Sequence, residues 1–508
     1  MAIMVDIRKE DDIERLREVA VLQDAEIGLL HERLSAMSRE IEKLREEKQG
    51  RLQQELQAVK AHLAKLQKIQ FGASSEKRKR DEADQKPKKR KGRSRSGPRP
   101  QPHLEREEAW FKLDDADRIC PGCGDPLCEM GELAEESELI DVVERKFVVK
   151  QVKRQKYTCR GCGHIEAALG PDKLRGTRRY SPDFAIEVAT NKYLDHLPLA
   201  RQVRIMERQG LLIDTQTLWD QLDALAEHVE TTYLGIKHWI FGADVVGMDE
   251  TTWRLMETGA TKKWQMWAIR GRGAMWFALR DSRSGETAAE LLDSYSGWLI
   301  TDGCPSYDKA ARLVPGEVRL SGCWAHVRRK FVDAESNDPE RAEAALNLIG
   351  KLYDVEKKAR DPDEGIALMD WRRDLRETES KSILKELKTW AFNQRVLPKS
   401  AIGKAIAYMM ERWERLELYI EHPELWIDNN PTERGIRGPV VGRKNHYGSR
   451  SRRGTEVAAQ LYTIFETAKI CGVDPREYLK RVVMNDIRSP NTVTLPAPIE
   501  AVLSSLDD

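Results

Sequence analysis

The chain has 508 residues, of which 33% are charged and 40% hydrophobic, and its formal net charge is +1. This length predicts about three domains, at roughly 150 residues each, and the apolar content excludes a wholly disordered chain. No apolar run approaches the roughly 18 residues of a membrane span, and the start from Met1 to Glu14 is too charged for a signal peptide. We therefore expect a cytoplasmic protein.

Residues 1–70 are predicted to form a coiled-coil oligomerisation helix. From Ile13 to Leu66 there is no proline, and apolar residues recur at alternating steps of three and four. The a positions hold Ile13, Ala20, Ile27, Leu34 and Ile41, and the d positions hold Leu16, Gln23, Leu30, Met37 and Leu44. This pattern favours two parallel strands, so we expect a homo-oligomer. The alternative is an amphipathic helix packed on its own domain.

Residues 71–104 have the composition of a basic, disordered linker, which cannot bury a core. Twelve lysines and arginines and three acids lie between Lys77 and Arg99, a local charge of +9. Clustered cations favour salt-sensitive contacts with nucleic-acid phosphates. The candidate DNA-binding residues here are Lys88, Lys89, Arg90 and Lys91. A solvated tether and a nuclear import signal are the alternatives.

Four cysteines in the segment 105–170 form two C-x-x-C pairs, which are Cys120 with Cys123 and Cys159 with Cys162. Two thiolates from each pair can surround one tetrahedral Zn²⁺ and leave no position open for substrate. We therefore predict a four-cysteine zinc ribbon with structural zinc, its strands at 139–149 and 152–157. Coincidental cysteine pairs are the alternative, and Cys128 fits neither pair.

Residues 171–238 are predicted to be a helical module that resembles a helix-turn-helix. Segments 183–194 and 199–208 are helix-like, Gly210 marks a turn, and a second helix runs through Leu218 and Val229. The candidate DNA-reading residues on that helix are Gln216, Thr217 and Gln221. Its aspartates oppose DNA binding electrostatically, so plain packing is an equal alternative.

Two aspartates end predicted strands in the segment 239–488. The apolar run from Val245 ends in Asp249, and the run from Trp298 ends in Asp302. Between them two alternating segments, 263–270 and 274–280, predict strands, and 286–295 predicts a helix. This element order is that of a ribonuclease H-like α/β domain. If the first and fourth strands are parallel, both acids lie at one edge. Glu433, near a helix start at Pro431, is the best third acid, with Asp428 and Glu466 as rivals.

These features together resemble a transposase of the insertion-sequence-sixty-six family, within the DDE superfamily. The resembling pieces in chain order are the coiled coil, 71–77, the two cysteine pairs, 195–199, 248–251, 301–303, 323–331, 429–434 and 442–445. The resemblance covers nearly the whole chain. It implies a multidomain α+β protein that binds the ends of its own element and acts on DNA in the nucleoid.

The resemblance implies that Asp249, Asp302 and Glu433 form a DDE triad that binds two Mg²⁺ ions, for which Mn²⁺ can substitute. Two such ions can activate the attacking oxygen and stabilise the leaving oxygen in a displacement at phosphorus. Hydrolysis would then be followed by transfer of the freed 3′-hydroxyl to target DNA. Small accessory proteins of the same element are implied as further partners. Glu250 is expected to point to the other face of its strand.

The spacing of 131 positions from the second to the third acid predicts a helical insertion at about 323–425. Cys323 and His326 in it have ligand-like spacing but lack a second pair, so packing or a hydrogen bond is favoured over a metal. A second basic cluster surrounds the third acid and would contact substrate phosphates. It comprises Arg434, Arg437, Arg443, Lys444, Arg450, Arg452 and Arg453.

Two departures from many relatives, Gly247-Met248 before the first aspartate and Cys304 after Gly303, leave local packing and target preference open. Residues 489–508 are expected to be a disordered tail. The competing functions are an inactive, DNA-binding relative that acts as a regulator and a stand-alone nuclease on the same fold. An intact triad favours the transposase over the regulator, and the coiled coil, linker and ribbon favour it over the nuclease.

Overall fold

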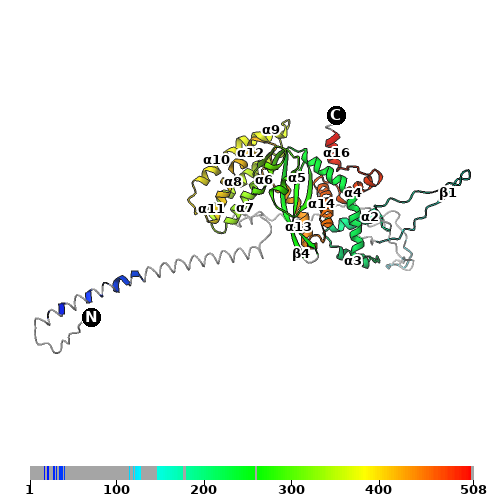
Figure 1. Cartoon of the computed structure of the whole chain (residues 1–508), viewed down its shortest axis with the longest axis horizontal. Coiled ribbons are helices and arrows are strands. Elements are labelled where there is room, and N and C mark those ends of the chain that lie inside the picture. The colour runs from blue at the N-terminus through cyan, green and yellow to red at the C-terminus, as the bar shows by residue number, and fades with distance from the viewer. Residues whose placement is uncertain are drawn as a thin grey trace, which may run out of the picture. The chain divides into compact units, whose positions relative to one another are not determined.

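The computed structural model describes residues 146–175, 179–257 and 260–504, together with 114, 118, 121–127 and scattered positions between 17 and 40 (Figure 1). Outside the described residues lie most of the predicted coiled coil, the linker with Lys88, Lys89, Arg90 and Lys91, and the cysteines Cys120 and Cys128. The chain divides into two compact units, Met1–Ile140 and Asp141–Asp508.

In the first unit, the described positions between residues 17 and 40 are helical. The predicted a residues Ile27 and Leu34 and d residues Leu30 and Met37 are 51–65% exposed. An apolar stripe on one helix is buried only when a partner covers it. The coiled coil therefore remains a prediction, and this exposed stripe supports it.

The second unit is built on a mixed five-stranded sheet. Its strands are β3 (Val245–Glu257), β4 (Ala260–Gly271), β5 (Ala274–Arg280), β6 (Gly297–Ile300) and β7 (Val318–Ser321), in the spatial order β5-β4-β3-β6-β7. β4 is antiparallel to both of its neighbours, and β3, β6 and β7 are parallel. Between β4 and β5, Arg272 and Gly273 both have positive φ, as the two-residue turn of a twisted hairpin requires.

Alternate residues of the central strands enter different cores, because successive side chains of a strand point to opposite faces. Val246 and Leu299 belong to a core with the helices on one face, whereas Val245 and Ile300 belong to the core of the helical insertion. Burial on both faces explains why the predicted strands are almost continuous apolar runs.

Two long helices, α4 (Thr215–Phe241) and α14 (Arg452–Ile470), cover the β5 end of the sheet (Figure 1). The backbone N–H of Met275 donates to Thr467 Oγ1 at 3.1 Å, and that of Phe277 donates to Thr463 Oγ1 at 3.0 Å. The carbonyl of Phe277 accepts from Tyr233 of α4 at 2.9 Å. Side chains of the two helices thus take the hydrogen bonds that a further strand would make.

The N-terminal helices of the unit pack into the same core as the sheet. They are α2 (Pro182–Ala189), the π-helical segment η4 (Thr190–Leu194) and α3 (Leu199–Arg208), and Gly210 then turns the chain at φ +83° into α4. Leu218 and Val229 of α4 are fully buried. Gln221 is only 4% exposed, so its predicted role in reading a DNA groove is wrong. The apolar face of α4 lies in the core, as plain packing requires. DNA reading by Gln216, which is exposed, and by Thr217 stays a prediction.

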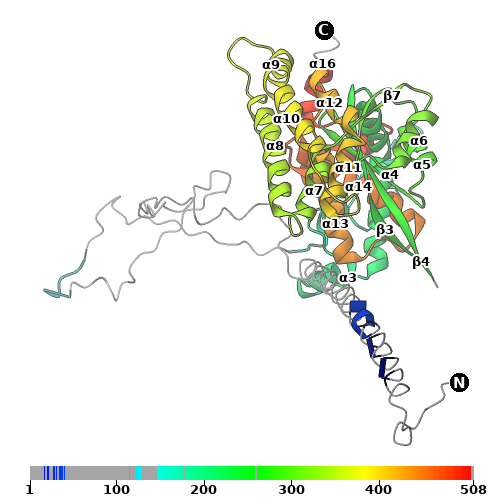
Figure 2. The ribbon, with the colours of Figure 1, turned by 90° about the vertical axis from the view of Figure 1, so that its left-hand side faces the viewer.

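The segment between β7 and residue 421 is helical and has a core of its own. Its elements are α7 (Trp324–Ala334), α8 (Pro339–Lys358), α9 (Leu368–Leu375), η5 (Arg376–Ser380), α10 (Lys381–Phe392), α11 (Ala401–Met410) and α12 (Trp413–Glu421). Figure 2 shows them gathered beside the sheet. The buried guanidinium of Arg376 joins α8 to the end of α12. It donates to Glu356 at 2.8 and 2.9 Å and to the carbonyls of Tyr419 and Leu425 at 2.7 and 2.9 Å.

The remaining helices are α5 (Gly285–Leu292), α6 (Pro305–Leu313), α13 (Asn430–His446), α15 (Pro475–Arg488) and α16 (Ala497–Ser504). The expectation of a disordered tail from residue 489 is wrong for residues 489–504. Thr494 is 3% exposed, its N–H donates to Thr232 of α4 at 3.1 Å, and its carbonyl accepts from Tyr478 at 2.8 Å. No described helix combines the length and apolar character needed to cross a bilayer.

Candidate active site

The pairing of β3 with β6 brings two aspartates to the same edge of the sheet. Gly247 pairs with Ile300 in parallel register, and Asp249 and Asp302 each lie two residues beyond this pair. Carboxyl ends of adjacent parallel strands meet at one edge, which is where open α/β sheets bind their ligands. The sequence-predicted convergence of these two acids is therefore met by the strand register.

Asp302 follows β6 in a tight turn. Its Oδ1 accepts from the backbone N–H of Cys304 at 2.9 Å, and its carbonyl accepts from the hydroxyl of Tyr408 at 2.6 Å. Gly303 adopts φ +77°, and a Cβ there would lie 2.6 Å from Nε of Arg412. Because a side chain would be both strained and crowded at this position, glycine lets Arg412, which follows α11, lie against the turn.

Glu433 lies in the first turn of α13, and the start of this helix is anchored on β3 and β4. The side-chain amide of Asn429 donates to the carbonyl of Met248 at 2.9 Å, and Arg270 donates to the carbonyl of Pro431 at 2.8 Å. A Cβ at Gly247 would lie 2.3 Å from both Asn429 Oδ1 and Thr432 Oγ1. Gly247 thus has a packing reason: it lets the start of α13 approach β3.

Electrostatics link the three acids. Burial, followed by the neighbouring charge of Glu250, raises the pKa of Asp249 to about 7, and Glu433 and Asp302 also contribute to the rise. A carboxylate whose pKa is raised by neighbouring carboxylates lies in a site that favours a cation or a shared proton.

The rival third acids have other partners. Asp428 accepts from the N–H of Asn430, the first residue of α13, at 3.0 Å and from the hydroxyl of Tyr353 at 2.8 Å. Glu466, on α14, pairs with Lys469 at 2.8 Å. Burial raises the pKa of both acids. Their bonds to these partners give each a structural role, whereas Glu433 acts electrostatically on Asp249.

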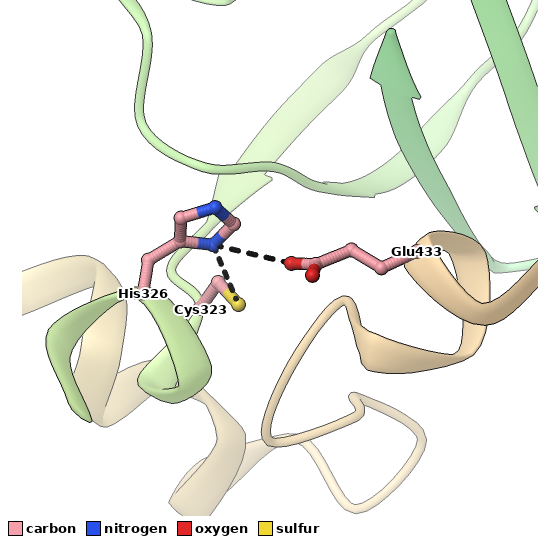
Figure 3. Close-up of side chains that lie close together, drawn as sticks. All are labelled: Cys323, His326 and Glu433. Carbon is pink, nitrogen blue, oxygen red and sulfur yellow. Dashed lines mark hydrogen bonds and ion pairs between the residues drawn. The ribbon is translucent and has the colours of Figure 1, made fainter. Parts of the chain in front are cut away.

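Glu433 has neighbours that the sequence did not identify as its partners. Its Oε2 accepts from Arg329 of α7 at 2.9 Å, and its Oε1 lies 3.7 Å from Nδ1 of His326 and is buried without a hydrogen-bond partner. Figure 3 shows Cys323 and His326 from the start of α7 facing Glu433. Spacing singled out Cys323 and His326, but it gave no sign that their neighbour is the third acid. Burial raises the pKa of the Cys323 thiol to about 12.

Glu250, which follows Asp249, binds Arg283 and the hydroxyl of Tyr307. Its side chain is 3% exposed. These partners lie on the loop before α5 and on α6, which explains how a second carboxylate is tolerated beside Asp249.

The predicted basic cluster divides into exposed and bonded residues. Arg434, Arg437 and Lys444 of α13 are exposed. Arg443 instead bonds the hydroxyls of Thr251 and Thr252 at 3.2 and 2.9 Å, and Arg453 bonds Asp223 at 2.6 Å. The exposed cations are free to meet phosphates, whereas Arg443 and Arg453 also hold the fold together.

The second cysteine pair lies in a tight hairpin. β1 (Lys156–Thr158) pairs with β2 (Ile165–Ala167), the N–H of Gly163 donates to the carbonyl of Cys159 at 2.9 Å, and Gly163 has φ +75°. The N–H of Cys162 lowers the pKa of Cys159, as does that of Gly161. Amides directed at sulfur favour the thiolate that zinc requires.

The first pair shows the same turn signature, since Gly124, directly after Cys123, has φ +80°. Of the strand predicted at 152–157, only Lys156 and Tyr157 lie in a β-strand. Residues 146–149, the described part of the strand predicted at 139–149, are not in a β-strand. Within the described residues the hairpin is therefore shorter than expected, and most of residues 146–156 are exposed.

Comparison with known proteins finds a family match for each of two segments of the chain. Residues 178–457 match the transposase IS66 family, that is, insertion sequence sixty-six, and residues 117–163 match the zinc-finger binding domain of transposase IS66. Three uncharacterized proteins of Sinorhizobium fredii (strain NBRC 101917 / NGR234) are similar. Protein y4qI is 31% identical over 75% of this chain and 72% of its own length, y4jD is 28% identical over 77% and 78%, and y4hP is 26% identical over 77% and 74%. The chain therefore belongs to the IS66 family of transposases, and it carries that family's zinc-finger domain.

Proposed function

We propose that this chain is an active DDE transposase that cuts DNA at the ends of its element and joins the freed 3′-hydroxyl ends to target DNA. The observation that carries the proposal is the pKa of Asp249, which Asp302 and Glu433 help to raise to about 7. The carboxylates at the end of β6 and on α13 thereby act on the carboxylate of β3. The strand order β5-β4-β3-β6-β7 with β4 antiparallel supports a ribonuclease H-like catalytic domain.

The donor set fits Mg²⁺. All three candidate ligands are carboxylates, the hard oxygen donors that Mg²⁺ prefers, and the buried Oε1 of Glu433 has no hydrogen-bond partner. Asp249, Asp302 and Glu433 would hold the metal. When bound, two Mg²⁺ ions supply Lewis-acid activation of the attacking oxygen and charge stabilisation of the leaving oxygen.

The protein's own groups orient the acids. The N–H of Cys304 fixes Asp302, the N–H of Glu250 donates to Asp249 Oδ1 at 2.8 Å, and Arg329 holds one oxygen of Glu433. Arg434, Arg437 and Lys444, exposed on the helix of the third acid, would bind substrate phosphates and position the scissile bond. Water is the first nucleophile, and the 3′-hydroxyl that it releases is the second.

The other parts of the chain would organise the DNA complex. The four-cysteine zinc finger, whose turns fit structural Zn²⁺, and the linker with Lys88, Lys89, Arg90 and Lys91 would add contacts to DNA. Basic residues of the second unit, Lys150, Lys153 and Lys156, are exposed near the hairpin. The N-terminal coiled coil would join two or more copies, and accessory proteins of the element would act with them at the nucleoid.

The test incubates wild type, Asp302→Asn and Glu433→Gln with Mg²⁺ or Mn²⁺ and a plasmid that carries the native flanking DNA. We expect wild type to cut at defined ends and both variants to lose cutting while they still bind those ends in a mobility-shift assay. A matched control, Asp428→Asn, tests the rival acid. Retained cutting in Glu433→Gln, with loss in Asp428→Asn, would refute the assignment of the third acid.

The second candidate is a DNA-binding relative without activity. Arg329 supports it, because in this structure its guanidinium already neutralises the carboxylate of Glu433. Binding to the flanks by wild type without any cutting, even after the accessory proteins are added, would favour this candidate. Scattered cuts would instead indicate a nuclease.

A further inference from the structure

The starts of two helices bring three potential metal ligands together beside the third acid. Cys323 is the N-cap of α7, His326 lies in the first turn of that helix, and Glu433 lies in the first turn of α13 (Figure 3). Nδ1 of His326 is 3.3 Å from Cys323 Sγ and 3.7 Å from Glu433 Oε1. One ligand atom from each residue lies within 4.8 Å of the others.

These separations match a tetrahedral metal site. Zinc binds sulfur at about 2.3 Å and imidazole nitrogen or carboxylate oxygen at about 2.0–2.2 Å. At a tetrahedral angle, the sulfur and nitrogen would therefore be roughly 3.6 Å apart, and the nitrogen and oxygen roughly 3.4 Å apart. The observed 3.3 and 3.7 Å differ from these values by only a few tenths of an ångström. The third pair, Cys323 Sγ and a carboxylate oxygen of Glu433, is also within 4.8 Å.

The surroundings hold the three residues in place. The N–H of Trp324 donates to the carbonyl of Ile427 at 3.1 Å and joins the start of α7 to the chain before α13. The N–H of the buried Asn429 donates to Cys323 Sγ at 3.2 Å. Such N–H groups directed at sulfur stabilise metal-bound thiolates. Glu433 Oε1, the oxygen that faces His326, is buried and has no hydrogen-bond partner.

We propose that Cys323, His326 and Glu433 form a second metal site, selective for Zn²⁺ or a similar divalent transition metal, with a fourth position open to water. Thiolate and imidazole ligands select such ions over Mg²⁺, which takes oxygen ligands. Three protein ligands and an open position distinguish this site from the closed zinc finger.

The site has a regulatory consequence that rests on the proposed function. Glu433 cannot serve both metals fully, because its Oε1, the oxygen nearest His326 Nδ1, would be taken by the second site. Zinc bound there withdraws the third carboxylate from Asp249 and Asp302. Zinc is therefore an inhibitor of the Mg²⁺-dependent reaction, and Cys323 and His326 set its affinity.

The binding test measures zinc per chain for the full-length protein after equilibration with buffered free Zn²⁺, without chelator. Wild type should bind one more equivalent than Cys323→Ser, His326→Asn or Glu433→Gln. Asp302→Asn and the controls Cys471→Ser and His422→Gln should match wild type, because none of these three residues is in the cluster. Thermal unfolding of each variant identifies any that fails to fold.

Equal zinc content in wild type, Cys323→Ser and His326→Asn would overturn the site, and so would loss of the extra equivalent in folded Asp302→Asn. Binding of Co²⁺ gives a second readout. Wild type should show stronger thiolate-to-cobalt absorption than Cys323→Ser, with the four-cysteine site intact in both proteins. These measurements need no catalytic activity, so they stand even if the proposed function fails.

The inhibition test adds Zn²⁺ to the Mg²⁺-dependent cleavage reaction, with each protein compared with its own zinc-free rate. The cleavage rate of wild type should fall at least about tenfold at zinc concentrations that fill the extra site. Cys323→Ser should keep its zinc-free rate at those concentrations. Equal inhibition of both proteins would refute the regulatory consequence and leave the binding result unaffected.

Discussion

At the residue scale, the buried negative charge of Asp249 destabilises the folded protein, and bound magnesium would offset this effect. The pKa of Asp249 is raised to about 7, chiefly by burial, from its ordinary value of 3.8. A carboxyl with a raised folded pKa contributes full stability below its unfolded pKa, near 4, and that contribution is lost as the pH rises towards 7. Above pH 7 the folded protein carries a buried, crowded negative charge.

Asp249→Asn should therefore stabilise the protein in magnesium-free buffer above pH 7, by up to roughly 4 kcal/mol for a shift of about three pKa units. Below pH 4 the difference should vanish. Denaturant unfolding at pH 5 and pH 8, without chelator so that zinc is retained, measures it. The exposed Asp281→Asn is the control and should show no such pH dependence. An equal effect of Asp249→Asn at both pH values would contradict the assigned cause.

Gly247 is the second residue whose role is local and testable. Gly247→Ala places a methyl group 2.3 Å from Asn429 Oδ1 and Thr432 Oγ1, so we expect a loss of about 1–3 kcal/mol. We also expect loss of DNA cleavage, because the start of α13 would shift and carry Glu433 with it. Gly350→Ala is the matched control: a Cβ there meets nothing within 4 Å, and alanine in a helix should stabilise by about 0.5–1 kcal/mol. Full cleavage by Gly247→Ala would argue against this anchoring.

At the scale of elements, α14 completes the sheet with side chains in place of a strand. Thr463→Val and Thr467→Val keep the shape of each side chain but leave the N–H of Phe277 or Met275 without its acceptor. Each should lower the free energy of unfolding by about 1–3 kcal/mol, the cost of a buried unsatisfied donor. Equilibrium denaturation measures this. Thr389→Val, exposed on α10, should change stability by much less, and an equal effect there would contradict the role of α14.

The elements differ in how well the sequence predicted them. The strands 263–270 and 274–280 were predictable because alternation and a two-residue turn are local signals, and β4 and β5 contain them. The lengths of the zinc-ribbon strands were not predictable, because apolar residues such as Val148 and Val149 suggest a strand in the sequence but are exposed in the structure. The tail was also mispredicted: only contact with α4 and α15 orders residues 489–504, and such contacts leave no local pattern.

At the scale of the whole molecule, self-association should depend on the N-terminal heptads. Leu30→Glu with Leu34→Glu should shift the full-length protein to a smaller species in light scattering after size-exclusion chromatography, because the charges would enter the predicted seam. Val21→Glu makes the same chemical change at a position that is also exposed but lies outside the a and d stripe, and it should leave the oligomer intact. A monomeric wild type, or equal disruption by Val21→Glu, would contradict the coiled coil.

The sequence alone determined the family, the zinc finger and the three candidate acids, because these rest on residue types at fixed spacings and on strand ends. Only the tertiary structure decided which groups surround Glu433. Cys323 and His326 lie 110 and 107 residues before it in the chain, and α7 and α13 meet only when the helical insertion packs on β3 and β6. The same packing buried Gln221 and ordered the C-terminal segment, since long-range burial is a property of the folded core that local spacing does not record.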